Sequence, residues 1–373
     1  MATPPRPSPN FMALAATEFC PPMTSLKFHN HLPLPTPAPT EMLIQVAFSD
    51  VNPVDGHKLT AKPEGTPTPN GRLIVGYGGS GFVQAMGDSV PAESFSIGDK
   101  VVFLCDSSKD GSYATHVCVD YRLVTIVPSA SPLDMAELAC LPVAGNTAYE
   151  ALEKVGLSLK DDITSPSSIN DKKGEGKTLL IVGGSGGVGS WATLLARAVY
   201  PQLEIIITSS TPTNTDTKNW CIERLGASRV IGHNQIDQAL PAGRNGIVDH
   251  ILCLTEPTSS IARALAEVLA PFGQICLVVA GKGIQSLDLG FIFFKSGSVH
   301  TETVFSSCRA GFRLDQAAQM ARILQLQLSP PLQPDWETIP GTRDWKDALK
   351  SGGILERATS GHNHGKLVMR IQP

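Results

Sequence analysis

The sequence has no apolar run that approaches the roughly 20 residues of a membrane-spanning helix. It also lacks an excess of positive charge, because 30 lysine and arginine residues stand against 34 aspartate and glutamate residues, for a formal net charge of −4. We therefore expect neither a membrane nor nucleic acid among its partners. What is present, 42% hydrophobic and 17% charged residues in a chain of 373, is typical of a soluble globular protein with two domains.

Cysteine pairs and targeting signals are missing as well. Eight cysteines are scattered along the chain without a C-x-x-C pair, a spacing that favours reduced, separately packed thiols over a disulfide framework. The first residues, MATPPRPSPNF, have neither the basic start nor the apolar core of a secretory signal. Their prolines predict a disordered lead-in over residues 1–11, and the lack of a targeting signal leads us to expect a cytoplasmic protein.

The segment after this lead-in is rich in short strands. Residues 32–48 begin with a proline-rich arm and continue with alternating apolar residues, which predicts a strand. Further strands are predicted in four segments that are closely bounded by glycine and proline: 72–87, 99–105, 112–121 and 123–128. This pattern, up to about residue 130, is typical of an all-β barrel or sandwich.

A change to helical spacing occurs at Ser131. Residues 131–156 are predicted to be helical, with Ser131 as the N-cap and Pro132 at the first helical position. The polar stretch that follows is interpreted as a surface insertion over residues 157–177. From Thr178, continuous apolar strands alternate with helices, which predicts a parallel sheet that is covered on both faces.

The tail contains a predicted helix over residues 313–328 and a predicted strand over residues 365–371. A final strand of this kind often returns to an earlier sheet, so the first domain is expected to be discontinuous. We therefore predict an α/β protein. A β-barrel domain is expected from residues 12–145 and 306–373, and a doubly wound parallel-sheet domain from residues 146–305.

The stretch TLLIVGGSGGVGSWATLLAR joins a buried strand to a helix through a glycine-rich turn. Its spacing is G-x-x-G-x-x-G instead of the commoner G-x-G-x-x-G. Residues without Cβ let the backbone approach a pyrophosphate, which then meets the N-terminus of the helix. This context predicts dinucleotide binding, and we assign the contacts to seven residues: Gly183, Gly184, Ser185, Gly186, Gly187, Val188 and Gly189.

The end of the next strand bears on the choice of dinucleotide. An acidic residue there would bind the ribose hydroxyls of NAD and repel a 2′-phosphate. This chain has Ser209 and Ser210 at that place and Lys218 nearby, whereas Asp216 lies farther into the loop. We therefore predict NADPH as the cofactor, with NADH as the less favoured alternative.

Seven strings of residues carry a family likeness: PLPTPAPTEMLIQV, VNPVDGHK, GYGGSGFVQAMG, FSIGDKVVF, LPVAGNTAYEAL, GGSGGVGSWATLLAR and GHNHGKLVMRI. In this order, along nearly the whole chain from Met12, they resemble the medium-chain dehydrogenase/reductase superfamily. The resemblance implies a GroES-like β-barrel catalytic domain and a Rossmann nucleotide-binding domain. Within the superfamily, the chain is similar to the quinone oxidoreductase and zinc-type alcohol-dehydrogenase-like branches and to fungal trans-acting enoyl reductases.

Zinc ligands are where the chain departs from part of that superfamily. The alcohol dehydrogenase branch holds catalytic zinc with a cysteine where this chain has Asn52, a histidine where it has Tyr77, and a cysteine where it has Val143. An amide and a phenol replace a thiolate and an imidazole poorly, and Val143 has no ligating atom. The four-cysteine structural zinc lobe is missing too, so the comparison with the family implies no zinc at either site.

The resemblance also places candidate reacting groups. Asn52 and Asp55 lie in the active-site turn beside the nicotinamide. Asn52 is expected either to donate a hydrogen bond through its amide or to stabilise the turn before Pro53. Gly78 and Gly79 stand where relatives commonly have an acidic or polar residue, which would either enlarge the pocket or add flexibility.

Four more residues are placed by the same resemblance. Tyr77 is expected to face the pocket, as a proton donor or as a stacking wall. His57 and Lys58 follow the turn where the enoyl reductases have a lysine, and the alternative is that both are solvated. Thr147 matches a position near the nicotinamide carboxamide or the substrate carbonyl.

A site without zinc limits the reactions that the chain is expected to catalyse. Alcohol oxidation would lack its usual stabilisation of an alkoxide, whereas reduction of an activated C=C bond or a quinone needs a hydride, a hydrogen-bond donor and a proton. The leading hypothesis is an NADPH-dependent, zinc-independent reductase of small quinones or α,β-unsaturated carbonyls.

Two alternatives stay open. One is a trans-acting enoyl reductase that partners the carrier protein of a polyketide synthase, and the other is a catalytically silent nucleotide-binding protein. The chain is expected to be a monomer or a homodimer that pairs through an edge strand at residues 284–294.

Overall fold

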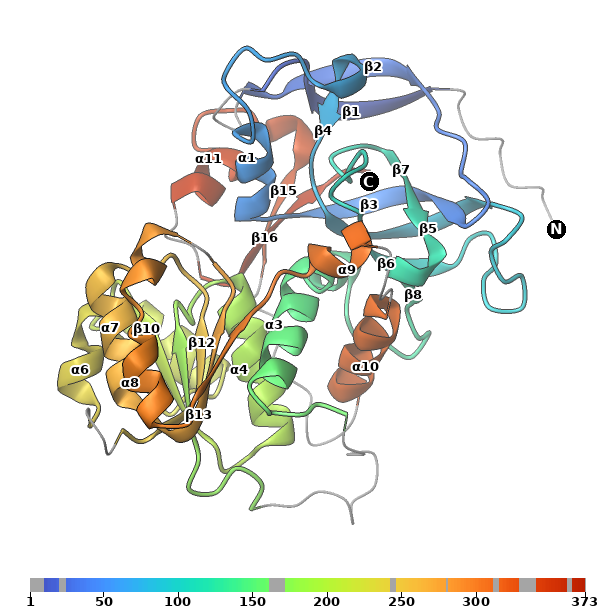
Figure 1. Cartoon of the computed structure of the whole chain (residues 1–373). Helices are drawn as coiled ribbons and strands as arrows, with labels where there is room; N and C mark the ends of the chain where they lie inside the picture. Colours follow the sequence, from blue (N-terminus) through green and yellow to red (C-terminus); the bar gives the residue numbers. More distant parts are fainter. Residues whose placement is uncertain are drawn as a thin grey trace. The chain divides into compact units, whose positions relative to one another are not determined.

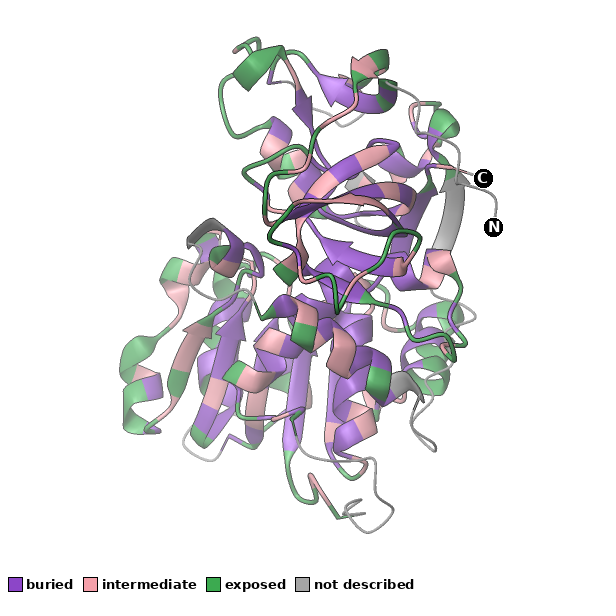
Figure 2. Cartoon of the chain, turned by 90° about the vertical axis from the view of Figure 1, so that its right-hand side faces the viewer, coloured by how far each residue is buried: buried purple, intermediate pink, exposed green. Residues whose placement is uncertain are grey.

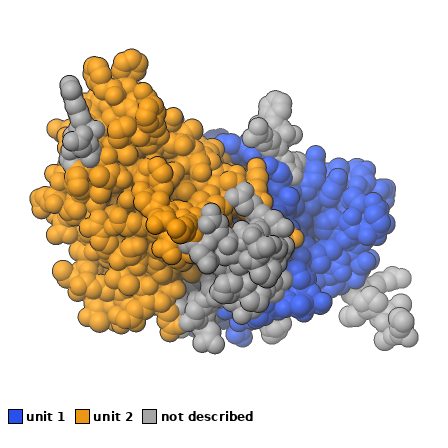
Figure 3. All heavy atoms as spheres, turned by 90° about the horizontal axis from the view of Figure 1, so that it is seen from below, with its two compact units in different colours: residues 1–143, 305–324, 339–373 blue, residues 144–304, 325–338 orange. Residues whose placement is uncertain are grey.

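The computed structural model describes residues 10–19, 25–160, 172–241, 246–279, 281–310, 315–328, 340–360 and 364–372. The chain divides into two compact units, drawn in different colours in Figure 3. Unit 1 consists of Met1–Val143, Phe305–Leu324 and Ile339–Pro373, and unit 2 of Ala144–Val304 and Gln325–Thr338. The predicted lead-in up to residue 9 and the centre of the predicted insertion, residues 161–171, lie outside the described residues.

Unit 1 contains two sheets. The smaller has the strand order β2–β1–β4, formed by Lys27–Pro33, Asn10–Ala16 and Leu73–Ile74. The larger has seven strands in the order β15–β16–β3–β5–β6–β8, with β7 also paired to β3. Its strands are β3 (Glu41–Val51), β5 (Gly78–Met86), β6 (Lys100–Leu104), β7 (His116–Asp120), β8 (Val124–Ile126), β15 (Pro340–Asp344) and β16 (Lys366–Arg370). Because β16 pairs antiparallel with β3, segments from both ends of the chain meet in one sheet.

Helices complete unit 1. Helix α1 (Pro53–Leu59) begins directly after β3, and α2 (Met135–Ala139) is followed by α3 (Pro142–Lys154), which continues into unit 2. The others are α9 (Phe305–Ala310), α10 (Gln316–Leu328) and α11 (Ile354–Ser360), with 3-10 segments at Pro69–Gly71, Tyr121–Leu123 and Trp345–Asp347. The described end of α10, from Gln325, belongs to unit 2, whereas the sequence predicts that residues 306–373 belong to the β-barrel domain.

The start of α2 corrects a prediction. Ser131 and Pro132 lie ahead of the helix, and Asp134 is its N-cap. The Asp134 carboxylate accepts a hydrogen bond from the Glu137 N–H at 2.8 Å, and the Glu137 carboxylate accepts one from the Asp134 N–H at 2.8 Å. This reciprocal capping box satisfies two backbone donors and explains why the helix starts there.

Unit 2 is built on a six-stranded sheet whose strands are all parallel (Figure 1). The order is β11–β10–β9–β12–β13–β14, which runs outward in both directions from β9, as in doubly wound sheets. The strands are β9 (Thr178–Val182), β10 (Glu204–Ser209), β11 (Arg229–Gly232), β12 (Val248–Cys253), β13 (Leu269–Leu277) and β14 (Ser298–Thr301). The predicted α/β fold class is confirmed.

Helices cover both faces of this sheet, with α6, α7 and α8 on one side and α3 and α4 on the other (Figure 1). They are α4 (Gly187–Val199), α5 (Thr215–Lys218), α6 (Ile236–Ala239), α7 (Ser259–Val268) and α8 (Leu289–Phe294). A π-helical turn spans Asn219–Arg224, and 3-10 segments span His233–Gln235 and Lys282–Ser286.

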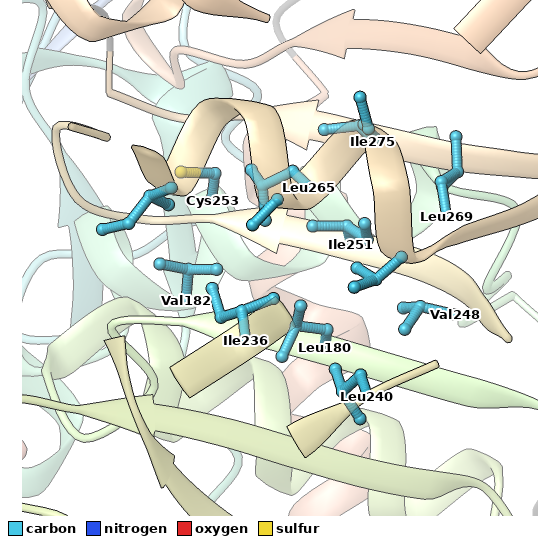
Figure 4. Close-up of a cluster of buried hydrophobic side chains, with 14 of the residues drawn as sticks. Leu180, Val182, Ile236, Leu240, Val248, Ile251, Cys253, Leu265, Leu269 and Ile275 are labelled. Carbon is cyan, nitrogen blue, oxygen red and sulfur yellow. The ribbon is translucent and has the colours of Figure 1, made fainter. Parts of the chain in front are cut away.

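Apolar packing holds the centre of the parallel sheet. The strand β9 is buried along its whole length, and buried residues follow the neighbouring strands as well (Figure 2). Figure 4 shows the cluster in which Leu180 and Val182 of β9 pack with Ile251 of β12 and Leu265 of α7. Each such side chain contributes roughly 1.5–3 kcal/mol when it is removed from water. The carboxyl end of β9, where the glycine turn begins, is therefore firmly held.

Three further details differ from the sequence-based expectations. Asn10 and Phe11 belong to β1 and not to the lead-in. Leu157 and Leu159 are buried, so the first residues of the predicted insertion pack into the protein. Residues 284–294 contain helical turns and not an edge strand, and β14 forms that edge of the sheet. None of the helices in the described ranges is long and apolar enough to cross a membrane.

Candidate functional site

The glycine turn of unit 2 contains positions that admit no side chain. Gly183 has a φ of +81°, and a Cβ there would lie 2.4 Å from Thr255 Cγ2. A Cβ on Gly184 would lie 2.6 Å from Ile207 Cγ2, and a Cβ on Gly189 would lie 2.4 Å from the Cα of Gly184. The absence of a Cβ on Gly189 lets α4 pack directly against the turn after β9, which is one of the roles of glycine in dinucleotide-binding turns. Gly183 and Gly184 leave room for Thr255 and Ile207 in the same way.

Gly186 is different, because its surroundings are open. A Cβ built on it meets nothing closer than the Gly183 carbonyl oxygen at 3.7 Å, and its φ of −80° suits any residue. It is the N-cap of α4, so the first N–H groups of the helix, from Gly187, Val188 and Gly189, have no carbonyl partner within the helix. Open space before a helix N-terminus favours an anion, and this turn therefore fits the pyrophosphate of a dinucleotide.

The end of β10 carries the residues predicted to distinguish the two cofactors. Ser209 is buried and its hydroxyl accepts a hydrogen bond from the Thr211 N–H at 3.2 Å. Ser210 and Lys218 are exposed, and Lys218 lies in the last turn of α5. Ser185, between the glycines, is partly exposed. Ser210 therefore offers an exposed hydroxyl at the carboxyl end of β10, and Lys218 offers an exposed positive charge on α5.

Two residues at the same edge were not anticipated from the sequence. The Thr208 hydroxyl accepts a hydrogen bond from the Gly183 N–H at 3.1 Å and lies 2.6 Å from His233 Nδ1. Burial lowers the pKa of His233, which favours the neutral ring. Thr208 and His233 thus tie the glycine turn to the ends of β10 and β11, and only the pairing of these strands brings them together.

In unit 1, a buried polar cluster surrounds the start of α1. Asn52 is the N-cap, and its N–H donates a hydrogen bond to Asp55 Oδ2 at 2.8 Å. The Tyr113 hydroxyl donates to the same oxygen at 2.9 Å. The structure thus brings together two of the predicted site residues, Asn52 and Asp55. Tyr113, which lies 58 positions from Asp55, was not predicted.

The electrostatics of this cluster affect Asp55 most. Burial raises the pKa of Asp55 from 3.8 to about 7, and the negative charge of Asp50 adds to the increase. The hydrogen bonds from Asn52 and Tyr113 and the charge of Lys366 act in the opposite direction. The same burial and the neighbouring Asp55 raise the pKa of Tyr113 well above its ordinary value. Asp55 can therefore hold or release a proton near neutral pH.

Lys366 enters this cluster from the last strand. The register of β16 on β3 pairs Leu367 with Val51, so Lys366 is level with Asn52. Its Nζ lies 3.0 Å from Asp50 Oδ2, donates to the Val51 carbonyl at 3.2 Å, and donates to Asn52 Oδ1. Lys366 and Asp50 are buried. Neither was expected from the sequence, and 314 positions separate Lys366 from Asn52.

The other predicted residues of unit 1 are less closely associated. His57 is exposed and Lys58 is half-buried. Tyr77 is fully buried, and its ring packs edge-on against Phe305 with 5.4 Å between ring centroids. In unit 2, Thr147 is a buried residue of α3. The roles assigned to these residues stay predictions.

Gly78 and Gly79 do not enlarge a pocket. A Cβ on Gly78 would lie 2.8 Å from Asp50 Oδ1 and 3.0 Å from Val143 Cγ2. A Cβ on Gly79 would lie 2.5 Å from the Phe48 carbonyl oxygen. Neither position has room for a larger residue, because strands and side chains pack directly against both glycines.

Neighbouring Thr147, Asn146 is a further unanticipated polar residue. It is fully buried in α3, and neither its amide nitrogen nor its amide oxygen has a hydrogen-bond partner among the described residues. A buried amide without a partner destabilises the folded state.

The donor set does not fit a catalytic zinc ion. Where the predicted ligand positions fall, the chain has an amide, a phenol and an isopropyl group, at Asn52, Tyr77 and Val143. Within the part of the chain that the structure describes, no group of three or more histidine, cysteine, aspartate or glutamate residues is arranged to hold a metal ion.

Comparisons with known proteins agree with this architecture. Residues 38–129 match the family model for the alcohol dehydrogenase GroES-like domain. A zinc-type alcohol dehydrogenase-like protein of Staphylococcus aureus is 32% identical over 272 residues, which are 73% of this chain and 73% of that protein. The 2-methylene-furan-3-one reductase of Solanum lycopersicum is 32% identical over 192 residues, which are 50% of this chain and 44% of that protein.

Solved structures extend the likeness to nearly the whole chain. One is a protein of Rhizobium etli CFN 42 whose name describes a zinc-dependent alcohol dehydrogenase. It has a TM-score of 0.76 and 26% sequence identity, and the match covers 98% of this chain and 99% of that protein. The quinone oxidoreductase of Coxiella burnetii has a TM-score of 0.71 at 22% identity, over 97% of this chain and 100% of its own. The second likeness is one of fold.

Proposed function

Because the chain belongs to the medium-chain dehydrogenase/reductase superfamily, we propose that it is an NADPH-dependent, zinc-independent reductase of quinones or α,β-unsaturated carbonyls. That it is an oxidoreductase of this superfamily follows from the relatives. Cofactor choice, independence from zinc and substrate class are our proposal. We also propose that it belongs to a zinc-free branch near the quinone oxidoreductases and the fungal trans-acting enoyl reductases.

The observation that carries the proposal is the open position at Gly186. It stands at the N-terminus of α4, next to glycines at which a Cβ would collide with neighbouring atoms. The N–H groups of Gly187, Val188 and Gly189 would hold the pyrophosphate, and the turn from Gly183 to Ser185 would carry the backbone beneath it. A bound nicotinamide dinucleotide supplies a hydride.

Preference for NADPH is supported by the side chains at the end of β10. Ser209 and Ser210 stand where an acidic residue would repel a 2′-phosphate, and Lys218 adds a positive charge. Asp216 lies in the first turn of α5 and is exposed, so its charge is well screened by water.

Independence from zinc is supported by the donor chemistry of this chain. Oxidation of a simple alcohol requires a Lewis acid, such as a zinc ion, to stabilise the alkoxide. Asn52, Tyr77 and Val143 are poor ligands for such an ion. Reduction of a conjugated C=C bond or a quinone develops negative charge on a carbonyl oxygen, which one well-placed hydrogen-bond donor stabilises. The names of two plant relatives, a 2-methylene-furan-3-one reductase and an NADPH-dependent alkenal/one oxidoreductase, describe substrates of this kind.

The chain's own residues would act as follows. The Asn52 amide binds the carbonyl oxygen of the substrate and stabilises the charge that develops on it. Asp55, with its pKa raised to about 7, keeps a proton available near neutral pH. Tyr77 and Thr147 stay candidate pocket residues, and His57 and Lys58 stay candidates for contacts with the substrate.

The test is oxidation of NADPH and NADH by the full chain with quinones, enones and enoyl thioesters, with and without a metal chelator. Turnover of an enone or quinone with NADPH that is insensitive to chelator supports the proposal. Turnover of thioesters alone would favour the carrier-dependent enoyl reductase instead. Loss of activity with chelator would refute independence from zinc, and stabilisation by NADPH without turnover of any substrate would favour a binding protein.

A further inference from the structure

The Asn52 amide is held in one orientation by the charge of its neighbour. Lys366 Nζ donates to Asn52 Oδ1 from the adjacent strand β16. An ammonium group has three N–H donors and no acceptor, so the side of the amide that faces it must be the oxygen. The usual ambiguity between the oxygen and the nitrogen of an asparagine side chain is therefore removed by chemistry.

The opposite side of the amide is left with an unused donor. Asn52 is buried, and its Nδ2 has no hydrogen-bond partner among the described residues. A buried donor without a partner destabilises the free protein. Such a group is most easily explained where a ligand supplies the missing acceptor.

We infer that Lys366 is the positioning residue of the reductase site: it fixes the Asn52 amide so that Nδ2 presents its N–H groups to the carbonyl oxygen of an α,β-unsaturated carbonyl or quinone. The inference rests on the proposed function, because it names the group that makes Asn52 an effective donor. Sequence position gives no hint of it, since Lys366 reaches Asn52 only through the pairing of β16 with β3.

The ammonium group is itself held in place. Its charge is paired with Asp50 at 3.0 Å, and the Val51 carbonyl accepts another of its hydrogen bonds at 3.2 Å. Lys366 and Asp50 have side chains that are 4% and 0% exposed. A group held by three neighbours in a buried site moves little, which is what positioning of a reacting group requires.

The charge of Lys366 also strengthens the donor. A positive charge at Oδ1 draws electron density from the amide, so the Nδ2–H groups become better donors as negative charge grows on the substrate oxygen. Lys366 does this without touching the substrate, and it acts through Asn52. Its removal is expected to slow turnover and to leave the affinity for NADPH unchanged.

A purely structural role is the competing explanation. A buried ion pair between β3 and β16 could simply hold the sheet together, and loss of one partner would leave an uncompensated charge. The Lys366→Met variant alone could therefore fail to fold. The double variant Asp50→Asn/Lys366→Met removes both charges together and keeps similar side-chain volumes.

The experiment is a cycle of kcat measurements with an enone or quinone that the full chain reduces. Asp50→Asn/Lys366→Met is compared with the starting protein, and the same pair of substitutions is then compared in a protein that already carries Asn52→Ala. Loss of one transition-state hydrogen bond typically lowers kcat by roughly a hundredfold. We expect about that loss when Asn52 is present and less than about threefold when it is absent, with NADPH affinity unchanged throughout.

A control outside this cluster separates position from stability. Lys295→Met removes another buried lysine, whose Nζ donates to the carbonyls of Ala266, Glu267 and Leu269. It is expected to lower the unfolding temperature and leave kcat unchanged.

An equal loss of kcat with and without Asn52 would overturn the inference and leave the proposed function standing. So would an unchanged kcat in the folded double variant. If the starting protein reduces no substrate at all, the proposed function itself fails, and the failure is seen before any variant is made.

Discussion

Replacement of Gly186 by aspartate tests the cofactor site most directly. In the free protein this position accepts a side chain, because a Cβ there meets nothing closer than 3.7 Å and its φ is −80°. Aspartate is also a better N-cap than glycine, and a negative charge at a helix N-terminus is favourable by about 0.3–1 kcal/mol. Gly186→Asp should therefore fold with unchanged or slightly increased stability.

Binding of NADPH should suffer severely in this variant. The carboxylate would occupy the space in which the pyrophosphate meets the first N–H groups of α4. Two unit charges about 4 Å apart repel by about 4 kcal/mol at an effective dielectric constant of about 20, which corresponds to about a thousandfold in Kd. Allowing for relaxation of the turn, we expect the Kd for NADPH to rise at least a hundredfold.

The assay is titration of NADPH fluorescence, with thermal unfolding of the free protein as the check on folding. Gly186→Asn is the matched control, since it has the same shape without the charge, and its loss of affinity should be clearly smaller. A folded Gly186→Asp variant whose Kd stays within threefold of the starting protein would refute the assignment of the turn to the pyrophosphate.

Three other substitutions give independent tests. Gly189→Ala should lower the free energy of unfolding by about 1–3 kcal/mol in urea titrations, because its Cβ would lie 2.4 Å from the Gly184 Cα; a neutral result would contradict the close contact of α4 with the turn. Asn146→Leu should raise the free energy of unfolding by about 1–2 kcal/mol, because it removes a buried amide without partners among the described residues, and a destabilised variant would reveal a partner for that amide. Asp55→Asn should flatten the pH dependence of stability. The pKa of Asp55 is raised from 3.8 to about 7 in the folded protein, so its contribution is present below pH 4 and is lost as the pH rises towards 7, by roughly 4 kcal/mol. Urea unfolding at several pH values checks this, and an identical profile in the variant would show that Asp55 ionises normally.

Local patterns in the sequence were sufficient for the architecture of unit 2 and for its candidate cofactor turn. The strand, the glycine turn and the helix from Thr178 to Val199 lie within one continuous stretch, and their signals are the periodicity of apolar residues and the need for residues without Cβ. Asn52 and Asp55 were brought forward differently, by the resemblance of VNPVDGHK to the active-site turn of the superfamily. Local evidence was insufficient at α2, because Ser131 and Asp134 are both suitable N-cap residues. The reciprocal hydrogen bonds between Asp134 and Glu137 place the N-cap at Asp134.

The sequence by itself therefore determined the fold class and the glycine turn, because both depend on patterns among neighbouring residues, and its family resemblance named the pair Asn52 and Asp55. Only the tertiary structure decided that Lys366 and Tyr113 join that pair, since strand register and packing bring together residues far apart in the chain. The tertiary structure also decided that Gly78 and Gly79 serve close packing and do not enlarge a pocket. Burial, which no local pattern specifies, raises the pKa of Asp55 to about 7.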